Sequence, residues 1–286
     1  MKIFIIGANG MIGSGIFKYL SKLKALKCYA LIRSSNYLNY LPDIYQDKTI
    51  VCGDLQDFNK IKEVVVKEKP DMIINCCGIT KHVPDSSNFI KVVKLNSLLP
   101  HLLSNICSQL NIRFVQISTD CVFSGLKGNY TEQDIPDPID FYGQSKHLGE
   151  VDYHSHLTIR TSTIGHEINS QNGLLEWFLN QKSCEGFEKA IFSGITTLEL
   201  AKIINEIILT NDSIKGMYHI SSVPIDKYSL LRLISNVYKH DAQITKNREY
   251  IIDRSLNSDK FYRSYNYKPP SWEEMVSFMH SYSLEN

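Results

Sequence analysis

The N-terminus carries the feature that most restricts the fold, a short apolar run followed by regularly spaced glycines. Lys2–Ile6 is rich in isoleucine, which is typical of a strand buried on both faces. Glycines then follow at GxxGxxG spacing and open an amphipathic helical pattern. Strand, glycine turn and helix in this order suit a dinucleotide pyrophosphate, because glycine lets the backbone approach the phosphates and the helix offers free N–H groups. A plain tight turn is the alternative for the glycines alone. The residues expected to bind are Gly7, Asn9, Gly10, Met11, Ile12 and Gly13.

Apolar runs alternate with amphipathic helical patterns through about the first 165 residues. The expected strands are Lys2–Ile6, Cys28–Ile32, Thr49–Cys52, Met72–Cys76, Arg113–Ile117 and Leu157–Arg160. Right-handed crossovers between them predict an α/β fold with a doubly wound parallel sheet. Beyond this point the pattern loosens. We expect a dinucleotide-binding domain over residues 1–165, with returning segments near 190–221, and a smaller α/β substrate lobe over 166–286 that closes over the ligand crevice.

The ends of the second and third strands indicate which dinucleotide binds. Arg33 and Ser34 stand where a fold that prefers NAD usually has an acidic residue for the ribose hydroxyls. A basic residue beside a small hydroxyl suits a 2′-phosphate, so we expect NADP rather than NAD. The alternative is that Arg33 is a solvated residue at a strand end. Asp54 and Leu55, after the third strand, are expected near the adenine by analogy with such folds.

The fourth strand ends in small residues that would leave room for a ligand at the carboxyl edge of the sheet. These residues are Cys76, Cys77, Gly78 and Thr80. Close helix packing is the alternative explanation for any one of them. The following long helix carries the polar Asn96 among apolar residues, and we expect this side chain to contact the cofactor. Pro100 is expected to kink or split that helix.

The segment from Ser118 to Glu150 carries the candidate chemistry. Tyr142 and Lys146 are four residues apart, which places the phenol and the ammonium on one helix face. A neighbouring cation favours the phenolate, so we expect a lowered pKa for Tyr142 and proton exchange during a reaction. Strand alternation puts Ser118 and Thr119 on opposite faces, so one hydroxyl can accompany the phenol. A packed tyrosine and a solvated lysine are the alternative.

Composition narrows the partners and the compartment. The chain has 286 residues, 43% of them hydrophobic, and a formal net charge of +1, so we expect neither nucleic acid nor a membrane surface as partner. Seven cysteines lack ligand-like spacing, which predicts reduced thiols and no metal site. No run resembles a signal peptide or a membrane span. We expect a cytoplasmic protein.

With these motifs in place, the sequence resembles the extended short-chain dehydrogenase/reductases, and more narrowly the dTDP-4-dehydrorhamnose reductase family. The matching segments are STDCVFSG, GNYTEQD, YGQSKHLGE and LTIRTS, within about the first 165 residues. The resemblance implies a Rossmann-type sheet and NADPH- or NADH-dependent reduction of the 4-keto group of a nucleotide-linked 6-deoxyhexose. Tyr142 would be the general acid, and Lys146 would bind the nicotinamide ribose. Thr119 would contact the substrate carbonyl, and Ser118 would lie at the cofactor.

The same resemblance implies a set of residues for the nucleotide-sugar substrate. They are Thr119, Asp120, Cys121, Tyr142, Thr163, Trp177 and Arg254. Arg254, Lys260 and Arg263 form a basic cluster that we expect near the substrate diphosphate, although solvated charges are the alternative for each. A homodimer is compatible with the sequence.

The sequence departs from the family pattern at two positions, so the identity of the substrate sugar is not fixed by the resemblance. Cys121 stands where these reductases usually have tyrosine, and Thr163 stands where they often have an aromatic residue. A UDP-linked acetamido sugar, or a CDP- or GDP-linked sugar, is therefore an alternative substrate. The same scaffold also suits an epimerase or dehydratase, or a non-catalytic dinucleotide-binding subunit. The regulatory subunit of methionine adenosyltransferase, which resembles the same family, is an example of such a subunit.

Overall fold

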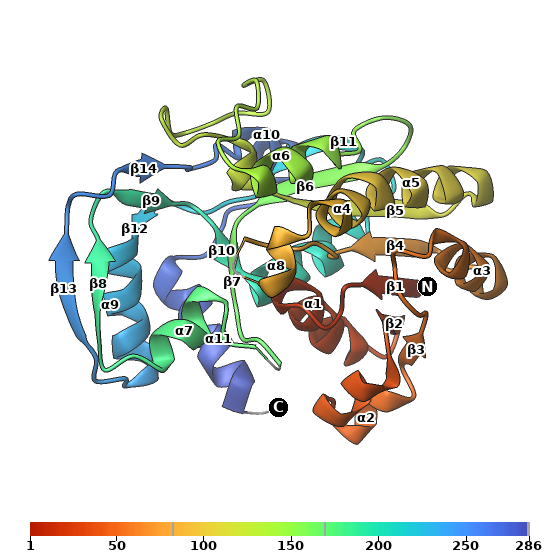
Figure 1. Cartoon of the computed structure of the whole chain (residues 1–286), viewed down its shortest axis with the longest axis horizontal. Coiled ribbons are helices and arrows are strands. Elements are labelled where there is room, and N and C mark those ends of the chain that lie inside the picture. The colour runs from red at the N-terminus through yellow and green to blue at the C-terminus, as the bar shows by residue number, and fades with distance from the viewer. Residues whose placement is uncertain (82, 169, 285–286) are drawn as a thin grey trace.

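A seven-stranded parallel sheet forms the centre of the molecule (Figure 1). The computed structural model describes residues 1–81, 83–168 and 170–284. The strands lie in the order β11-β6-β5-β4-β1-β2-β3, and every neighbouring pair is parallel. The predicted doubly wound sheet is confirmed. Its strands are β1 (Lys2–Ile6), β2 (Lys27–Ile32), β3 (Thr49–Val51), β4 (Met72–Asn75), β5 (Arg113–Thr119), β6 (Leu157–Thr161) and β11 (Gly216–His219).

Alternate side chains of β1 enter two separate cores, which explains why its sequence is apolar throughout. Ile3 and Ile5 belong to one core, and Phe4 and Ile6 belong to the other. Helices supply the rest of both cores, so both faces of the sheet are covered. The first core includes residues of α1 (Met11–Ser21), α2 (Asp43–Gln46), α8 (Thr197–Ile203) and α11 (Trp272–Leu284), and the second includes residues of α3 (Phe58–Glu68), α4 (Phe89–Val92) and α5 (Leu99–Leu110).

The helix before β5 is divided, as its proline predicted, but the division precedes the proline. A π-helical turn, Val93–Leu98, separates α4 from α5, and Pro100 lies in the first turn of α5. The wide turn carries the buried Asn96 and receives the end of α6 (Phe141–Leu148). A Cβ atom on Gly149 would stand 1.9 Å from the Asn96 carbonyl oxygen, so only glycine permits this close packing.

Side-chain hydrogen bonds fix the starts of two helices. Thr196 caps α8 by accepting from the Glu199 N–H at 3.2 Å. Ser271 and Glu274 form a reciprocal capping box at α11, with Oε2 of Glu274 accepting from the Ser271 N–H at 2.7 Å and Oγ of Ser271 accepting from the Glu274 N–H at 3.2 Å. No helix in the described ranges is both long and apolar enough to cross a bilayer.

A smaller lobe of short strands lies beside the central sheet, at the left of Figure 1. The sequence does not predict these strands, because several have only two or three residues and show no periodicity. β11 joins the central sheet and α8 packs on α1, while the boundary at residue 165 stays a prediction. The other elements are β7 (Thr163–Ile164), β8 (Ser183–Phe187), β9 (Ala190–Phe192), β10 (Ile195–Thr196), β12 (Ile225–Asp226), β13 (Gln243–Asn247), β14 (Ile252–Asp253), α7 (Leu174–Leu179), α9 (Lys227–Tyr238) and α10 (Asp259–Tyr265).

Candidate active site

The glycine turn after β1 has the geometry that a phosphate cradle requires. Gly7 has a φ of +76°, and a Cβ atom on it would stand 2.7 Å from the Cys77 backbone nitrogen. A Cβ atom on Gly13 would stand 2.3 Å from the Gly7 carbonyl oxygen. Gly10 is the N-cap of α1 and carries no side-chain oxygen, so the first N–H groups of the helix are left for another acceptor. The turn therefore fits the pyrophosphate of a dinucleotide.

A tyrosine that the sequence analysis did not single out supports this turn. Tyr37, in the short 3-10 helix η1 (Ser35–Tyr40), is buried and donates its hydroxyl to the Ala8 carbonyl at 3.1 Å. Arg33 and Ser34 are exposed at the end of β2. A hydrogen bond from the Gln56 N–H lowers the pKa of Asp54, and the Arg33 charge contributes to the same shift. The two strand ends thus bring Arg33 and Asp54 near each other.

The end of β4 lies against the Tyr142 helix. Oδ1 of Asn96 accepts from the Ile79 N–H at 2.7 Å, and its Nδ2 donates to the Ile79 carbonyl at 2.9 Å and to the Ser145 hydroxyl at 3.0 Å. Asn96 therefore holds the strand end against α6, and its contact with a cofactor stays a prediction. A Cβ atom on Gly78 would stand 3.8 Å from Nζ of Lys146, so this glycine lies directly over the lysine. Leu55 and Cys77 are half-buried nearby, whereas Thr80 is exposed.

The two hydroxyls at the end of β5 point in different directions, as strand alternation predicted. Ser118 donates to Glu150 Oε1 at 2.7 Å. Thr119 donates to Asp120 Oδ1 at 3.1 Å, and it is the hydroxyl that lowers the pKa of the Tyr142 phenol against the effect of burial. Of the two, Thr119 is therefore the hydroxyl that accompanies the phenol, while Ser118 is held in a buried network.

Tyr142 and Lys146 come from the α6 helix, which Asp140 caps by accepting from the Gly143 N–H at 2.7 Å. Nζ of Lys146 donates to the Ile117 carbonyl at 2.7 Å. The predicted lowering of the Tyr142 pKa is wrong for this structure: burial raises the pKa, and the hydrogen bond with Thr119 opposes the rise only in part. Burial lowers the pKa of Lys146, against the charges of Cys77 and Glu150. The phenol is thus a neutral proton donor at pH 7.

A buried ion pair that the sequence analysis missed fixes the far end of α6. Arg160 of β6 donates from Nε to Glu150 Oε1 at 2.8 Å and from Nη2 to Glu150 Oε2 at 2.7 Å. Burial would raise the pKa of Glu150, but the hydrogen bonds from Arg160 and His147 outweigh burial and lower the pKa to about 2. Together with the Ser118 hydroxyl, this pair joins β5, β6 and α6. In the sequence, the only signs of this ion pair are the arginine of LTIRTS and the glutamate of YGQSKHLGE.

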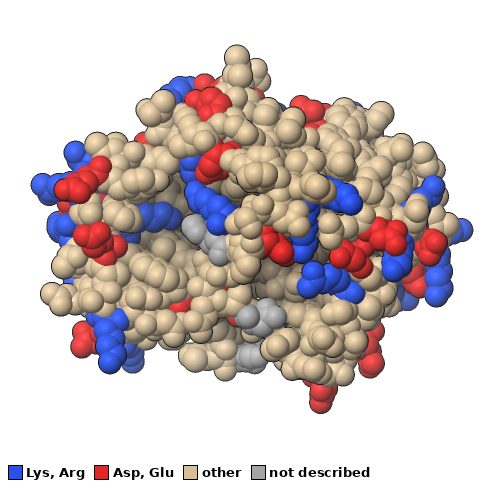
Figure 2. Space-filling view, viewed as in Figure 1, with Lys and Arg blue, Asp and Glu red and all other residues tan. Residues whose placement is uncertain are grey.

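The small lobe contributes cations to the same region. Arg254 is 9% exposed, and its Nη1 lies 3.4 Å from Sγ of Cys121. Burial lowers the pKa of Lys227, which the sequence analysis missed, and the charge of Asp120 opposes this shift. Figure 2 shows basic side chains on the wall of a hollow between the lobe and the sheet.

The rest of the predicted basic cluster lies elsewhere. Nζ of Lys260 donates to the Met217 carbonyl of β11 at 2.6 Å, and Arg263 pairs with Asp259 of its own helix at 3.2 Å. Neither contact involves Arg254, and the approach of Lys260 and Arg263 to a substrate diphosphate stays a prediction. Thr163 is half-buried in β7, and Trp177 is 38% exposed on α7. Their contacts with a substrate stay predictions.

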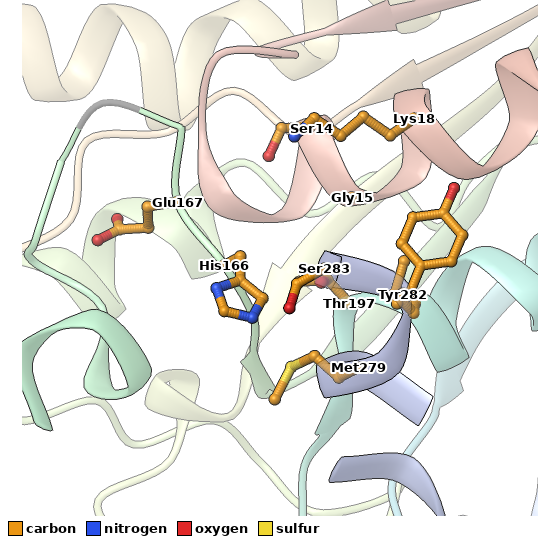
Figure 3. A pocket seen from close by; sticks show the side chains of 10 residues that line it. Ser14, Gly15, Lys18, His166, Glu167, Thr197, Met279, Tyr282 and Ser283 are labelled. Atoms are coloured by element: carbon orange, nitrogen blue, oxygen red, sulfur yellow. The ribbon is translucent and has the colours of Figure 1, made fainter. Parts of the chain in front are cut away.

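A separate pocket of about 210 Å³ lies along the flank of α1 (Figure 3). Ser14 and Lys18 of α1 face Met279 and Ser283 of α11 across it. His166 on its wall is already bonded to Glu176 at 2.7 Å and to the Tyr238 hydroxyl at 2.9 Å. The residues that line the pocket include none of the predicted site residues, so the candidate active site remains the edge of the sheet at Tyr142.

Two curated relatives are similar to about half of the chain. The chain is 31% identical over 155 residues to a probable low-salt glycan biosynthesis reductase of Haloferax volcanii, in a match covering 52% of this chain and 48% of the relative. It is 29% identical over 152 residues to the dTDP-4-dehydrorhamnose reductase of Burkholderia thailandensis, covering 53% and 45%. The chain thus spans about half the length of these curated relatives.

Solved structures match over a longer range. A hypothetical dTDP-4-dehydrorhamnose reductase from Sulfolobus tokodaii superposes with a TM-score of 0.77 at 26% identity, covering 96% of this chain and 98% of the other. The dTDP-4-dehydrorhamnose reductase of Bacillus anthracis, solved with NADP, superposes with a TM-score of 0.81 at 21% identity, covering 99% of both chains, and shows the shared fold.

The family model described as the RmlD substrate binding domain matches residues 1–281. Its match includes the glycine turn, the Thr119–Tyr142–Lys146 group and most of the small lobe. The chain therefore belongs to the RmlD family, on the extended short-chain dehydrogenase/reductase fold.

Proposed function

We propose that this protein reduces the 4-keto group of a nucleotide-linked 6-deoxyhexose with NADPH, as a step in nucleotide-sugar and polysaccharide biosynthesis. The observation that carries the proposal is the meeting of the Tyr142 phenol, the Thr119 hydroxyl and Lys146 at one end of the parallel sheet, beside the glycine turn. The similarity to a dTDP-4-dehydrorhamnose reductase supports the same reaction class.

The residues that would hold the cofactor fit it chemically. The α1 N-terminus and the space over Gly7 and Gly10 suit its pyrophosphate, and Arg33 suits the 2′-phosphate of NADP. Gly78 leaves the nicotinamide ribose free to approach Lys146. When bound, the reduced nicotinamide supplies the hydride.

The protein's own groups supply the proton. In the proposed reaction the carbonyl carbon gains a hydride while its oxygen takes the phenolic proton of Tyr142, and solvent later restores that proton. The raised pKa keeps Tyr142 protonated until negative charge develops on the substrate oxygen. Thr119 orients the phenol and bonds the same oxygen. Lys146, held by the Ile117 carbonyl, stabilises the phenolate that remains.

The experiment is cofactor oxidation measured against dTDP-, UDP-, GDP- and CDP-linked 4-keto-6-deoxy sugars, with NADPH and NADH in parallel. We expect NADPH-dependent turnover of at least one sugar and none without a keto sugar. Formation of the reduced sugar is checked by mass spectrometry, which separates reduction from epimerisation or dehydration. UDP-linked acetamido sugars belong in the panel because Thr163 replaces an aromatic residue.

A second candidate is a non-catalytic subunit. The chain is 23% identical over 254 residues to the methionine adenosyltransferase 2 subunit beta of Danio rerio, covering 83% of this chain and 74% of that one. Dinucleotide binding without turnover of any sugar in the panel would favour this candidate over the reductase.

A further inference from the structure

The pocket along α1 contains a buried hydroxyl that the protein itself does not use. Thr197, the first residue of α8, lines this pocket and is 2% exposed. Within residues 1–81, 83–168 and 170–284, its hydroxyl makes no hydrogen bond. A buried polar group without a partner is unfavourable, and such groups in native proteins usually have a reason. The Thr197 hydroxyl therefore indicates a ligand in the pocket.

Two glycines keep space free around this hydroxyl. Gly15 of α1 lines the pocket, and a Cβ atom on it would stand 2.8 Å from Oγ1 of Thr197. A Cβ atom on Gly165 would stand 2.3 Å from the same oxygen. The pocket volume of about 210 Å³ is many times the roughly 10–15 Å³ that one water needs. The space beside Thr197 can therefore hold a small organic molecule.

Lys18 adds a cation to the wall of the pocket. It is half-buried, and in Figure 3 its side chain runs along α1 toward Ser14. In the part of the chain that the structure describes, no carboxylate oxygen lies within 4.0 Å of its ammonium. Burial lowers the pKa of Lys18, and the charge of Lys22 adds to this shift. Glu167 on the same wall is used within its own loop, because its Oε2 accepts from the Gly173 N–H at 2.8 Å. The ammonium therefore favours an anionic group on the ligand.

Two serines of the pocket can accept hydrogen bonds but have no proton left to donate. Ser14 donates to the Met11 carbonyl at 3.1 Å, and Ser283 donates to the His280 carbonyl at 2.7 Å. Their oxygens keep free lone pairs, so they suit the hydroxyl groups of a ligand. The buried Met279 supplies an apolar surface between them. The pocket thus combines one cation, one free hydroxyl and two acceptors.

We propose that this pocket binds a small hydroxylated anion, of the class of a sugar acid or a sugar phosphate. The anionic group is bound by Lys18 and the Thr197 hydroxyl, and the ligand hydroxyls donate to Ser14 and Ser283. A carboxylate and a phosphate share the chemistry recognised here, because the lysine ammonium is a compact point charge. The site is separate from the sheet edge at Tyr142, and the inference does not depend on the proposed function.

The test is calorimetry on the full chain in the presence of excess NADP⁺, so that a phosphate ligand does not enter the cofactor site. The probes are glucuronate, glucose 1-phosphate and neutral glucose. We expect at least one of the two anions to bind, and glucose to bind at least 10-fold more weakly. Lys18→Met should weaken binding of that anion roughly 10- to 100-fold. Lys24→Met, at an exposed lysine just after α1, is the matched control and should bind like wild type.

Thr197→Val separates a ligand site from a structural role. It keeps the shape of the side chain and removes a hydroxyl without a partner, so thermal unfolding should show equal or higher stability. Anion binding should fall roughly 2- to 10-fold. A less stable Thr197→Val would show that the protein itself uses the hydroxyl, and this would overturn the inference.

The binding data can overturn the inference in three further ways. Neither anion binds, or glucose binds as tightly as the anions, or Lys18→Met loses no more affinity than Lys24→Met. Binding of glucuronate alone would support a sugar acid as the ligand, and binding of glucose 1-phosphate alone would support a sugar phosphate.

Discussion

The edge of the central sheet that carries Tyr142 and the small lobe balance their charges in opposite ways. At the sheet edge, Glu150 and Arg160 pair within the protein and Lys146 is held by a backbone carbonyl. On the small lobe, Lys227 contacts the Phe192 ring and Arg254 contacts the Phe123 carbonyl and the Cys121 thiol, all of them neutral groups, and the charge that acts on Lys227 is that of Asp120. The difference is that the sheet edge balances its charges within the protein, whereas the cations of the lobe are held mainly by neutral groups.

The largest expected effect comes from removing the hydroxyl of Tyr142, the proposed proton donor at the sheet edge. Tyr142→Phe should lower turnover about 100- to 10,000-fold, because the ring keeps its packing while the acidic proton is lost. NADPH binding, measured by calorimetry, should stay close to wild type. Tyr250→Phe, at a ring that is 51% exposed, is the control. Undiminished turnover in Tyr142→Phe would remove the phenol from the mechanism.

Breaking the buried ion pair should lower the free energy of unfolding rather than the rate of turnover. Glu150→Gln leaves Arg160 buried without its counter-charge, so the free energy of unfolding should fall by about 3 kcal/mol. The pKa of Glu150 is about 2 in the folded protein, below its ordinary value of 4.5. Its contribution is therefore present above pH 4.5 and is lost as the pH falls toward 2. Denaturant unfolding at pH 7 and at pH 3 should show a smaller difference between variant and wild type at pH 3; an equal difference at both values would contradict this assignment.

A smaller effect is expected at the exposed end of β2. Arg33→Gln should weaken NADPH binding about 10-fold and leave NADH binding nearly unchanged, because only NADPH carries a phosphate for this side chain. Lys62→Gln, on the exposed side of α3, is the control. Tighter binding of NADH than of NADPH by the wild type would show that Arg33 does not set the preference.

The smallest effect should distinguish the two neighbouring hydroxyls. Ser118→Ala removes one of several hydrogen bonds to Glu150, so we expect a loss of about 1 kcal/mol in stability and nearly wild-type turnover. Thr119→Ala should show the reverse, with turnover reduced and stability kept. If both variants lost turnover equally, the assignment of Thr119 to the reaction and of Ser118 to stability would be wrong.

The sequence predicted the sheet because its strands are buried on both faces and read as continuous apolar runs, as in β1. It predicted that Ser118 and Thr119 point in opposite directions, because side chains alternate along any strand, whereas the choice of Thr119 came from the family resemblance. It did not predict the π turn that carries Asn96, since a wide turn and a regular helix share nearly the same apolar spacing. The short strands of the small lobe are fixed by tertiary pairing, as β9 is by β12 and β14.

Local sequence therefore determined the sheet, the glycine turn and the spacing of Tyr142 and Lys146, because each depends on neighbouring residues and on simple periodicity. Tertiary structure decided the protonation of Tyr142, since burial raises its pKa and the hydrogen bond with Thr119 opposes the rise only in part. It also decided which cations reach the site. Lys227 and Arg254 come from separate elements, and the folding of the small lobe brings Arg254 to Cys121 and Lys227 within the influence of Asp120, while Lys260 bonds to Met217 and Arg263 to Asp259.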